Sequence, residues 1–388
     1  MPAPSVTVNV ANPGLQAVLA KGRLQSVDVL RGAIMVIMAL DHCRDFTHAP
    51  ALARTFQPED LTRASSFLFL TRWITHFCAP VFMLTAGLGA YFWARRGKTT
   101  AELSRFLLLR GLWLIFLEVT VSHLALFFNF DYSVLVVVIL WALGGSMIAL
   151  AGLVWLPARL LLPLSLVVIL GHNLFDKIPA ERFGSAAGLW NVLHQQGLFR
   201  LFGQPIFIAY PLVPWIAVMA AGFALGPVFQ WEPARRRRVL VAIGISLTIA
   251  FVINRALNVY GDPRPWAAQA SPLFTVLSFL NCAKYPPSLD FLLMTLGPAL
   301  AVLGWLDRVS LSAANPLVVF GRVPLFYFLA HLFLYHGAGV ILGHWVPGGF
   351  GLTGVYVIWI TGVVLLYPVC LWFARLKDRR RDWWLGYL

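Results

Sequence analysis

The chain has 388 residues, of which 59% are hydrophobic and only 12% are charged, and its mean hydropathy is +0.76. A soluble domain carries about 25% charged residues, so the composition excludes an ordinary soluble protein. The formal net charge of +14 does not indicate nucleic-acid binding, because Lys and Arg gather in short loops between apolar runs.

Many apolar runs reach the length that crosses a bilayer. The sequence therefore predicts an all-α, polytopic transmembrane bundle of about ten spans. We expect these spans at about 27–46, 66–94, 104–126, 132–155, 158–173, 205–229, 239–258, 288–306, 315–337 and 352–374. An eleventh element, a half-helix near 272–284, is an alternative, because irregular backbone at membrane depth has to line protein or water.

The distribution of positive charge predicts the orientation of the chain. With ten spans both termini lie on one side, and the loops of that side hold most of the Lys and Arg, so both termini are predicted to be cytoplasmic. We expect a cytoplasmic N-terminal segment (1–24), a transmembrane domain (25–376) and a basic, aromatic cytoplasmic tail (377–388). The four cysteines show no CxxC spacing, so we predict neither a metal site nor a structural disulfide.

The first span carries ionisable residues on one face. Arg31 and His42 are eleven positions apart, so they share a stripe and lie roughly 16 Å apart along the axis. Asp28 is placed to pair with Arg31, and Asp45 to orient the His42 imidazole. Asp41 lies about 100° round the helix. Charge within a membrane helix indicates function, although an Arg31–Asp28 pair and an interfacial His42 explain the pattern equally well.

Further polar residues lie in three other spans. Arg72 and His76 are four apart in the second, which places both on one face of that helix. Tyr327 and His331 have the same spacing in the ninth. These four are candidates to line a pocket, with inter-helix hydrogen bonding as the alternative. Glu118 in the third span is expected to be the buried partner of an arginine, and a catalytic or substrate-binding role is the second interpretation.

Two arginines near the start of the third span, Arg105 and Arg110, face the predicted cytoplasmic side. Arginine suits phosphate, so they are candidates to bind the phosphates of a nucleotide-like donor. Anionic lipid is the default partner of such arginines.

Several segments together resemble one family. Residues 23–32 (RLQSVDVLRG) resemble the first-helix signature of membrane acyltransferases related to the heparan-α-glucosaminide N-acetyltransferase catalytic domain. Residues 210–215 (YPLVPW), 284–289 (KYPPSL) and 321–327 (GRVPLFY) resemble a bacterial branch of that family. The wider superfamily, which includes bacterial O-acyltransferases of surface glycans, has an Arg, ten intervening residues and a His in its first helix, and Arg31 to His42 fits that spacing.

The resemblance implies a function for these residues. His42 would be the acyl-transfer histidine and Arg31 its companion; His48 is the nearest counterpart of the first-loop histidine of the lysosomal branch and ranks below His42. The donor would be a cytoplasmic acyl-CoA, most simply acetyl-CoA. The acceptor would be a hydroxyl or amine of an envelope glycan or lipid-linked sugar at a bacterial inner membrane, where lipid surrounds the protein. A homodimer is left open.

Two other classes of function fit the same residues. A transporter or flippase would use the buried His, Arg and Glu residues as a substrate or proton path. A non-catalytic relative would only scaffold an envelope complex. Turnover of acyl-CoA distinguishes the acyltransferase from both.

Overall fold

The computed structural model describes residues 24–380, 382 and 385 and confirms the all-α membrane class. Among the described residues, eight helices are long and apolar enough to cross a membrane: Ser66–Ala94, Thr100–Phe127, Ala158–Phe175, Val213–Gln230, Pro233–Leu257, Leu289–Leu306, Pro324–Gly343 and Leu352–Arg379. Nearly all of the predicted N-terminal segment and part of the predicted tail lie outside the described residues.

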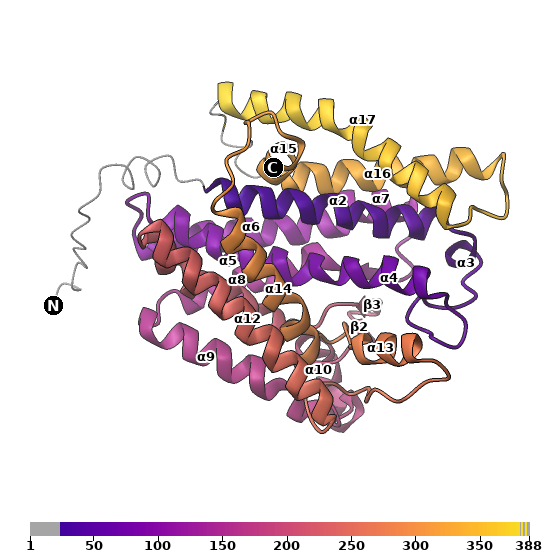
Figure 1. Ribbon diagram of the computed structural model, residues 1–388, viewed down its shortest axis with the longest axis horizontal. Helices are drawn as coiled ribbons and strands as arrows, with labels where there is room; N and C mark the ends of the chain where they lie inside the picture. The colour runs from indigo at the N-terminus through magenta and orange to yellow at the C-terminus, as the bar shows by residue number, and fades with distance from the viewer. Residues whose placement is uncertain (1–23, 381, 383–384, 386–388) are drawn as a thin grey trace.

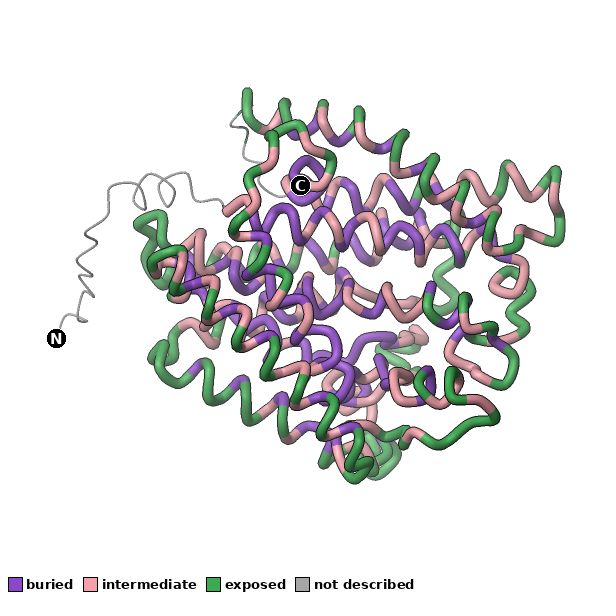
Figure 2. The backbone as a smooth tube through the Cα atoms, viewed as in Figure 1, coloured by how far each residue is buried: buried purple, intermediate pink, exposed green. Residues whose placement is uncertain are grey.

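Helix α2 (Gln25–Thr47) lies near the middle of the bundle (Figure 1). It packs against α15 (Pro316–Arg322), α16 (Pro324–Gly343) and α17 (Leu352–Arg379) on one side and α5 (Cys78–Ala94) on the other. Figure 2 shows α2 buried over much of its length, whereas peripheral α9 (Ala158–Gly171) is exposed over much of its length. The ionisable stripe of the first helix therefore faces protein rather than lipid.

Two of the spans are not uniform α-helices. The second consists of α4 (Ser66–Ile74), the 3₁₀ turn η1 (Thr75–Phe77) and α5, and Pro80, which has no N–H to donate to the carbonyl of His76, explains the tight turn. The third consists of α6 (Thr100–Leu117), the π-helical turn η2 (Glu118–Ser122) and α7 (His123–Phe127). Turns of the π type are frequent at functional sites.

A small sheet lies between the helices and shortens two predicted spans. Strand β3 (Gln204–Ile208) pairs in parallel with β1 (Leu135–Val137) and antiparallel with β2 (Gly197–Leu201). The helices predicted at 132–155 and 205–229 therefore begin later, as α8 (Ile139–Leu153) and α11 (Val213–Leu225). Backbone groups of 135–137 and 204–208 bond across the sheet instead of continuing a helix.

The predicted helix at 315–337 is broken in two. Val323 has φ −129° and ψ 50°, which ends α15 and lets α16 begin at Pro324. Proline disfavours α-helical backbone in the preceding residue and is well suited to a first helical turn. The break separates the stretch that packs on the start of α2 from the one that carries His331.

The remaining helices complete the bundle: α3 (Ala49–Leu52), α9 (Ala158–Gly171), η3 (His172–Phe175), η4 (Ala180–Ala186), α10 (Ala187–Leu193), η5 (Gly226–Gln230), α12 (Pro233–Leu257), α13 (Pro272–Leu280) and α14 (Leu289–Leu306). Helix α13 occupies the stretch where a half-helix was the alternative. Buried Arg255 fixes this irregular region, because its guanidinium donates hydrogen bonds to the carbonyls of Phe279 (2.9 Å), Arg264 (3.0 Å) and Asn281 (3.1 Å).

Glycines allow α2 and α15 to approach closely. A Cβ atom at Gly32 would overlap the carbonyl oxygen of Leu317, and one at Gly321 would overlap that of Asp28. Each helix therefore presents a glycine to the backbone of the other, an arrangement that small residues permit in membrane bundles. This contact fixes the start of α2 against the C-terminal third of the chain.

We expect Gly32→Ala to destabilise the protein, because the added methyl group overlaps backbone rather than a movable side chain. Overpacking of this kind costs about 1–3 kcal/mol. Gly337→Ala on α16, where a Cβ meets nothing within 4 Å, is the matched control and should be neutral or slightly stabilising. Thermal unfolding of both variants in one detergent checks this. Equal unfolding midpoints would show that the close approach of α2 and α15 does not restrict residue size at Gly32.

Candidate functional site

A cavity of about 390 Å³ lies between α2, α5, α6, α8 and α16. Four charged side chains contribute to its lining: Asp28, Arg31, Arg96 and Arg110. Asp28 and Arg31 come from the first two turns of α2, Arg96 lies just beyond the end of α5, and Arg110 is near the middle of α6. The three arginines make one part of the cavity cationic, while the remainder of the lining is mainly apolar.

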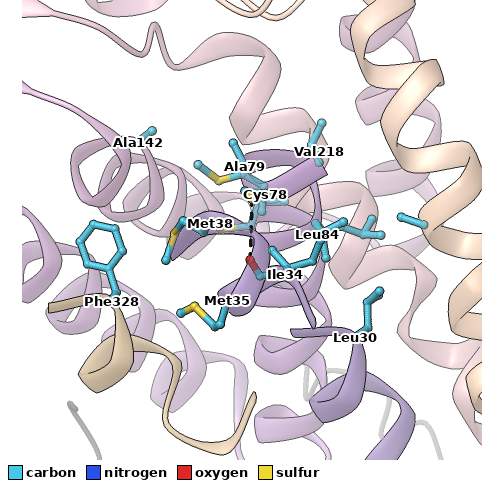
Figure 3. Packing of buried hydrophobic residues seen from close by; sticks show 14 of the residues in the cluster. Leu30, Ile34, Met35, Met38, Cys78, Ala79, Leu84, Ala142, Val218 and Phe328 are labelled. Atoms are coloured by element: carbon cyan, nitrogen blue, oxygen red, sulfur yellow. Dashed lines mark hydrogen bonds between the residues drawn. The ribbon is translucent and has the colours of Figure 1, made fainter. Parts of the chain in front are cut away.

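The apolar end of the cavity leads to His42. Met35 and Met38 continue the face of α2 that carries Asp28 and Arg31, and both line the cavity. Figure 3 shows their side chains pointing toward Phe328 of α16, which is also a lining residue. The Phe328 ring stands edge-on to the His42 ring, with centroids 6.3 Å apart. One turn of α2 therefore separates the lining from His42.

His42 forms a pair with His331 from α16. The Nδ1 atom of His42 lies 2.6 Å from Nε2 of His331, and the two rings are nearly parallel, with an interplanar angle of 14°. His331 is completely buried, and its Nδ1 lies 3.0 Å from the carbonyl oxygen of Tyr327. Two predicted site residues that are 289 positions apart in the chain are thus in direct contact.

Arg31 takes a position at the cavity wall that suits ligand binding. Its guanidinium donates a hydrogen bond to the carbonyl of Thr85 on α5, and a Cβ built on Gly89 would lie 3.2 Å from one of its nitrogens. Asp28 and Arg31 both line the cavity, as their shared helical face predicts. The α5 backbone therefore holds Arg31 beside the cavity.

An ionic network lies next to His42 at the other end of α2. Asp41 pairs with Arg72 of α4 and, at 3.0 Å, with Arg44. Arg72 also donates to Glu59 through Nε, at 2.8 Å. Asp41 thus lies between two guanidinium groups, which explains why it faces away from the Arg31–His42 stripe.

Glu59 connects this network to the loop before α14. Burial raises the pKa of the Glu59 carboxyl, but nearby His76 and the hydrogen bond from Arg72 outweigh it and hold that pKa below its usual range. The Glu59 carbonyl accepts a hydrogen bond from Asn281 at 2.9 Å. The loop that carries Glu59 and the loop before α14 are thereby joined.

Asp45 does not take the predicted place, and His48 lies at the end of α2. The Asp45 carboxylate accepts a hydrogen bond from Arg44 at 2.6 Å, and its side chain is 47% exposed. Among the described residues the hydrogen-bond partner of His42 is His331, which corrects the prediction that Asp45 orients the ring. The neighbouring guanidinium attracts the carboxylate more strongly than a neutral imidazole does. His48 is buried at the end of α2, where its backbone forms a β-bridge with Phe350.

Glu118 caps a helix and does not pair with an arginine. It is buried in the π-helical turn, and its carboxylate accepts a hydrogen bond from the backbone N–H of Trp141 at 3.0 Å. That N–H belongs to the first turn of α8, where a negative charge is favourable. Within the described part of the chain no arginine or lysine nitrogen forms an ion pair with Glu118, so the predicted partnership is corrected.

The remaining candidates divide between the two ends of the site. His76 is buried and packs on Phe291. Its Nε2 lies 3.8 Å from Oε1 of Glu59, so it belongs to the ionic network. Tyr327 is buried and stacks near His331, with centroids 5.5 Å apart. Arg110 lines the cavity, whereas Arg105 is exposed and is not among the lining residues.

Sequence reasoning missed four residues of the site. Arg96 lines the cavity, but its basic run indicated only the cytoplasmic side. Arg44 and Glu59 belong to the ionic network, and no periodicity connects them. Lys284 is 94% buried, and its ammonium lies over the Tyr285 ring, 5.3 Å from the centroid. The only sequence signal for Lys284 was its position in the KYPPSL segment, which resembles the family.

Fold and site together define the class of this protein. It is a polytopic α-helical membrane protein with a cationic cavity that leads to a buried histidine pair. Residues 23–261, more than half of the chain, match the family described as heparan-alpha-glucosaminide N-acetyltransferase, catalytic. The chain belongs to this family, and membership implies a membrane acetyltransferase type of activity. No curated protein matches the chain.

The family match does not cover the whole site. It includes α2, α5, α6 and α8 and therefore Arg31, Arg110 and His42. His331 and Phe328 of α16 lie beyond its last residue, although they complete the cavity and the histidine pair.

We expect Asp41→Asn to destabilise the protein strongly, because it leaves Arg44 and Arg72 without their shared carboxylate. Removing one partner of a buried ion pair costs about 3–5 kcal/mol. Asp45→Asn is the matched control: it breaks a pair whose carboxylate is exposed, and such pairs contribute at most about 1 kcal/mol. Thermal unfolding in nanodiscs compares them, and an Asp41 variant as stable as the Asp45 variant would contradict the network's importance.

Proposed function

We propose that the protein is an integral membrane acyltransferase that moves an acyl group, most simply acetyl, from cytoplasmic acyl-CoA to an acceptor on the opposite face. The acceptor is a hydroxyl or amine of an envelope glycan or lipid-linked sugar. The cavity is the observation that carries this proposal, because it is cationic at one end and its apolar lining ends one helical turn from His42.

The proposed topology has ten spans. It adds α2 and α8 to the eight long apolar helices. Helix α2 is 23 residues long, so it extends about 34 Å despite its charged ends. Basic residues then concentrate where α2 begins, with the run 235–238 among them. Both termini are placed in the cytoplasm of a bacterial cell, with the protein in the inner membrane.

The cavity suits a CoA thioester as donor substrate. Arg31, Arg96 and Arg110 offer guanidinium groups for its phosphates, and the mainly apolar lining suits its long arm. Arg31 and His42 are separated by about 16 Å along α2. A donor held by its phosphates at the cationic end would therefore extend its thioester toward the histidine pair.

His42 is proposed as the general base. It takes the proton from the acceptor hydroxyl or amine as that group attacks the thioester carbonyl. The carbon–sulfur bond then breaks, and the leaving CoA thiolate takes the proton from the His42 imidazolium. In a second version of the mechanism His42 attacks first and carries the acyl group until the acceptor displaces it.

Replacing His42 by Ala should abolish acyl transfer while the folded protein remains in the membrane. Purified protein is incubated with labelled acetyl-CoA, and release of CoA together with acylation of protein or acceptor is measured. His344→Ala is the control, because this histidine is exposed just beyond the end of α16. Full activity in the His42 variant would sink the proposal, and substrate transport by wild type without acyl-CoA turnover would favour a transporter or flippase.

The two arginines of α6 give a matched test of the donor site. We expect Arg110→Ala to raise KM for acetyl-CoA about tenfold, because a hydrogen bond to a charged group contributes about 1.5–3 kcal/mol. Arg105→Ala, on the same helix but exposed and outside the cavity, should leave KM unchanged. Equal KM values for both variants would place the donor elsewhere.

A further inference from the structure

The histidine pair contains one hydrogen bond whose direction is determined by chemistry. Nδ1 of His331 lies 3.0 Å from the carbonyl oxygen of Tyr327, one turn earlier on α16. A carbonyl oxygen only accepts hydrogen bonds, so Nδ1 of His331 carries the hydrogen. In a neutral imidazole the other nitrogen, Nε2, then holds a lone pair and accepts.

The surroundings of His331 favour its neutral form. Its side chain is completely buried, and aromatic rings of Tyr327, Phe328 and Tyr335 surround it, with centroids between 5.5 and 6.3 Å away. Charge in an apolar site is costly without a partner of opposite sign. No carboxylate among the described residues forms an ion pair with His331.

The direction of the second hydrogen bond follows from the first. Nε2 of His331 accepts, so Nδ1 of His42, 2.6 Å away, must donate. The hydrogen of neutral His42 is then on Nδ1, and its lone pair is on Nε2. Nε2 lies on the opposite side of the imidazole ring from Nδ1, so the free lone pair points away from α16.

We propose that His331 is the positioning residue of this site: it holds His42 in the Nδ1–H tautomer, so that Nε2 of His42 is the atom that takes the acceptor's proton or the acyl group. The role of Nε2 in the reaction rests on the proposed function. The tautomer rests on the geometry of the two hydrogen bonds. His331 thus has the place that a carboxylate takes in other base-orienting arrangements.

The pair also changes during the proposed reaction. When Nε2 of His42 takes the acceptor's proton, both of its nitrogens carry hydrogen and the ring becomes positive. The hydrogen bond from Nδ1 to Nε2 of His331 is then charge-assisted and stronger. His331 therefore stabilises the imidazolium without gaining a proton, and His42 returns its proton from Nε2 to the leaving thiolate.

Two substitutions of similar volume separate positioning from packing. His331→Gln keeps an oxygen that can accept from Nδ1 of His42, whereas His331→Leu fills the space and accepts nothing. We expect Leu to lower kcat at least about tenfold, a part of the roughly 10²–10⁴-fold that a positioned base supplies. KM for acetyl-CoA should stay unchanged, and Gln should restore most of kcat.

His344 provides the matched control on the same helix. Its Nδ1 also bonds to the carbonyl one turn earlier, Val340, at 2.8 Å, but within the described part of the chain no second imidazole bonds to it. His344→Leu should therefore leave kcat and KM unchanged. Wild-type kcat in His331→Leu, with His42→Ala inactive, would overturn the positioning role and leave the proposed function intact.

Nitrogen-15 NMR of histidine-labelled protein tests the tautomer without any need for activity. The His42 signals are assigned by their loss in His42→Gln. We expect the Nδ1–H form of His42 in wild type and in His331→Gln, and its replacement by the Nε2–H form in His331→Leu. An Nε2–H form in wild type would overturn the proposal, whereas the expected form in a protein without acyl transfer would contradict only the proposed function.

Discussion

Ionisable groups inside an apolar bundle need partners, and this constraint determines how the helices around α2 are arranged. Asp41 requires the cations of Arg44 and Arg72, and Arg72 in turn binds Glu59 from the loop before α4. Buried charge is tolerated only where such pairing offsets the loss of water. The position of α4 against α2, and of the Glu59 loop beside them, follows from these pairs.

The same constraint gives the two ends of α2 different chemistry. At its start, arginines from three segments surround a cavity, where they can meet an anionic ligand. At its far end, charges of both signs neutralise one another beside His42, so that end holds an imidazole pair in a fixed geometry. Under the proposed function, a helix of this kind suits a reaction whose two substrates arrive from opposite faces of a membrane.

Local pattern predicted most of the helices and the shared face of Arg31 and His42, because both depend on residues near in sequence. The sheet was missed because strands of three to five residues between apolar spans look like helix ends. Partners across helices were harder: Asp45 was assigned to His42 by spacing, but it binds Arg44, and His331 comes from 289 positions away. Packing, which periodicity does not encode, decides such contacts.

The site needs both halves of the chain. The region that matches the family ends at residue 261 and supplies His42, the proposed base, and the arginines, whereas α16 supplies His331 and closes the cavity with Phe328. Because of the break before Pro324, Gly321 of α15 contacts the backbone of α2 near Asp28. Helix α16 then follows α2 toward His42. An uninterrupted helix over 315–337 would have to follow one line past α2. The proline break therefore lets one segment make both the close backbone contact and the histidine contact.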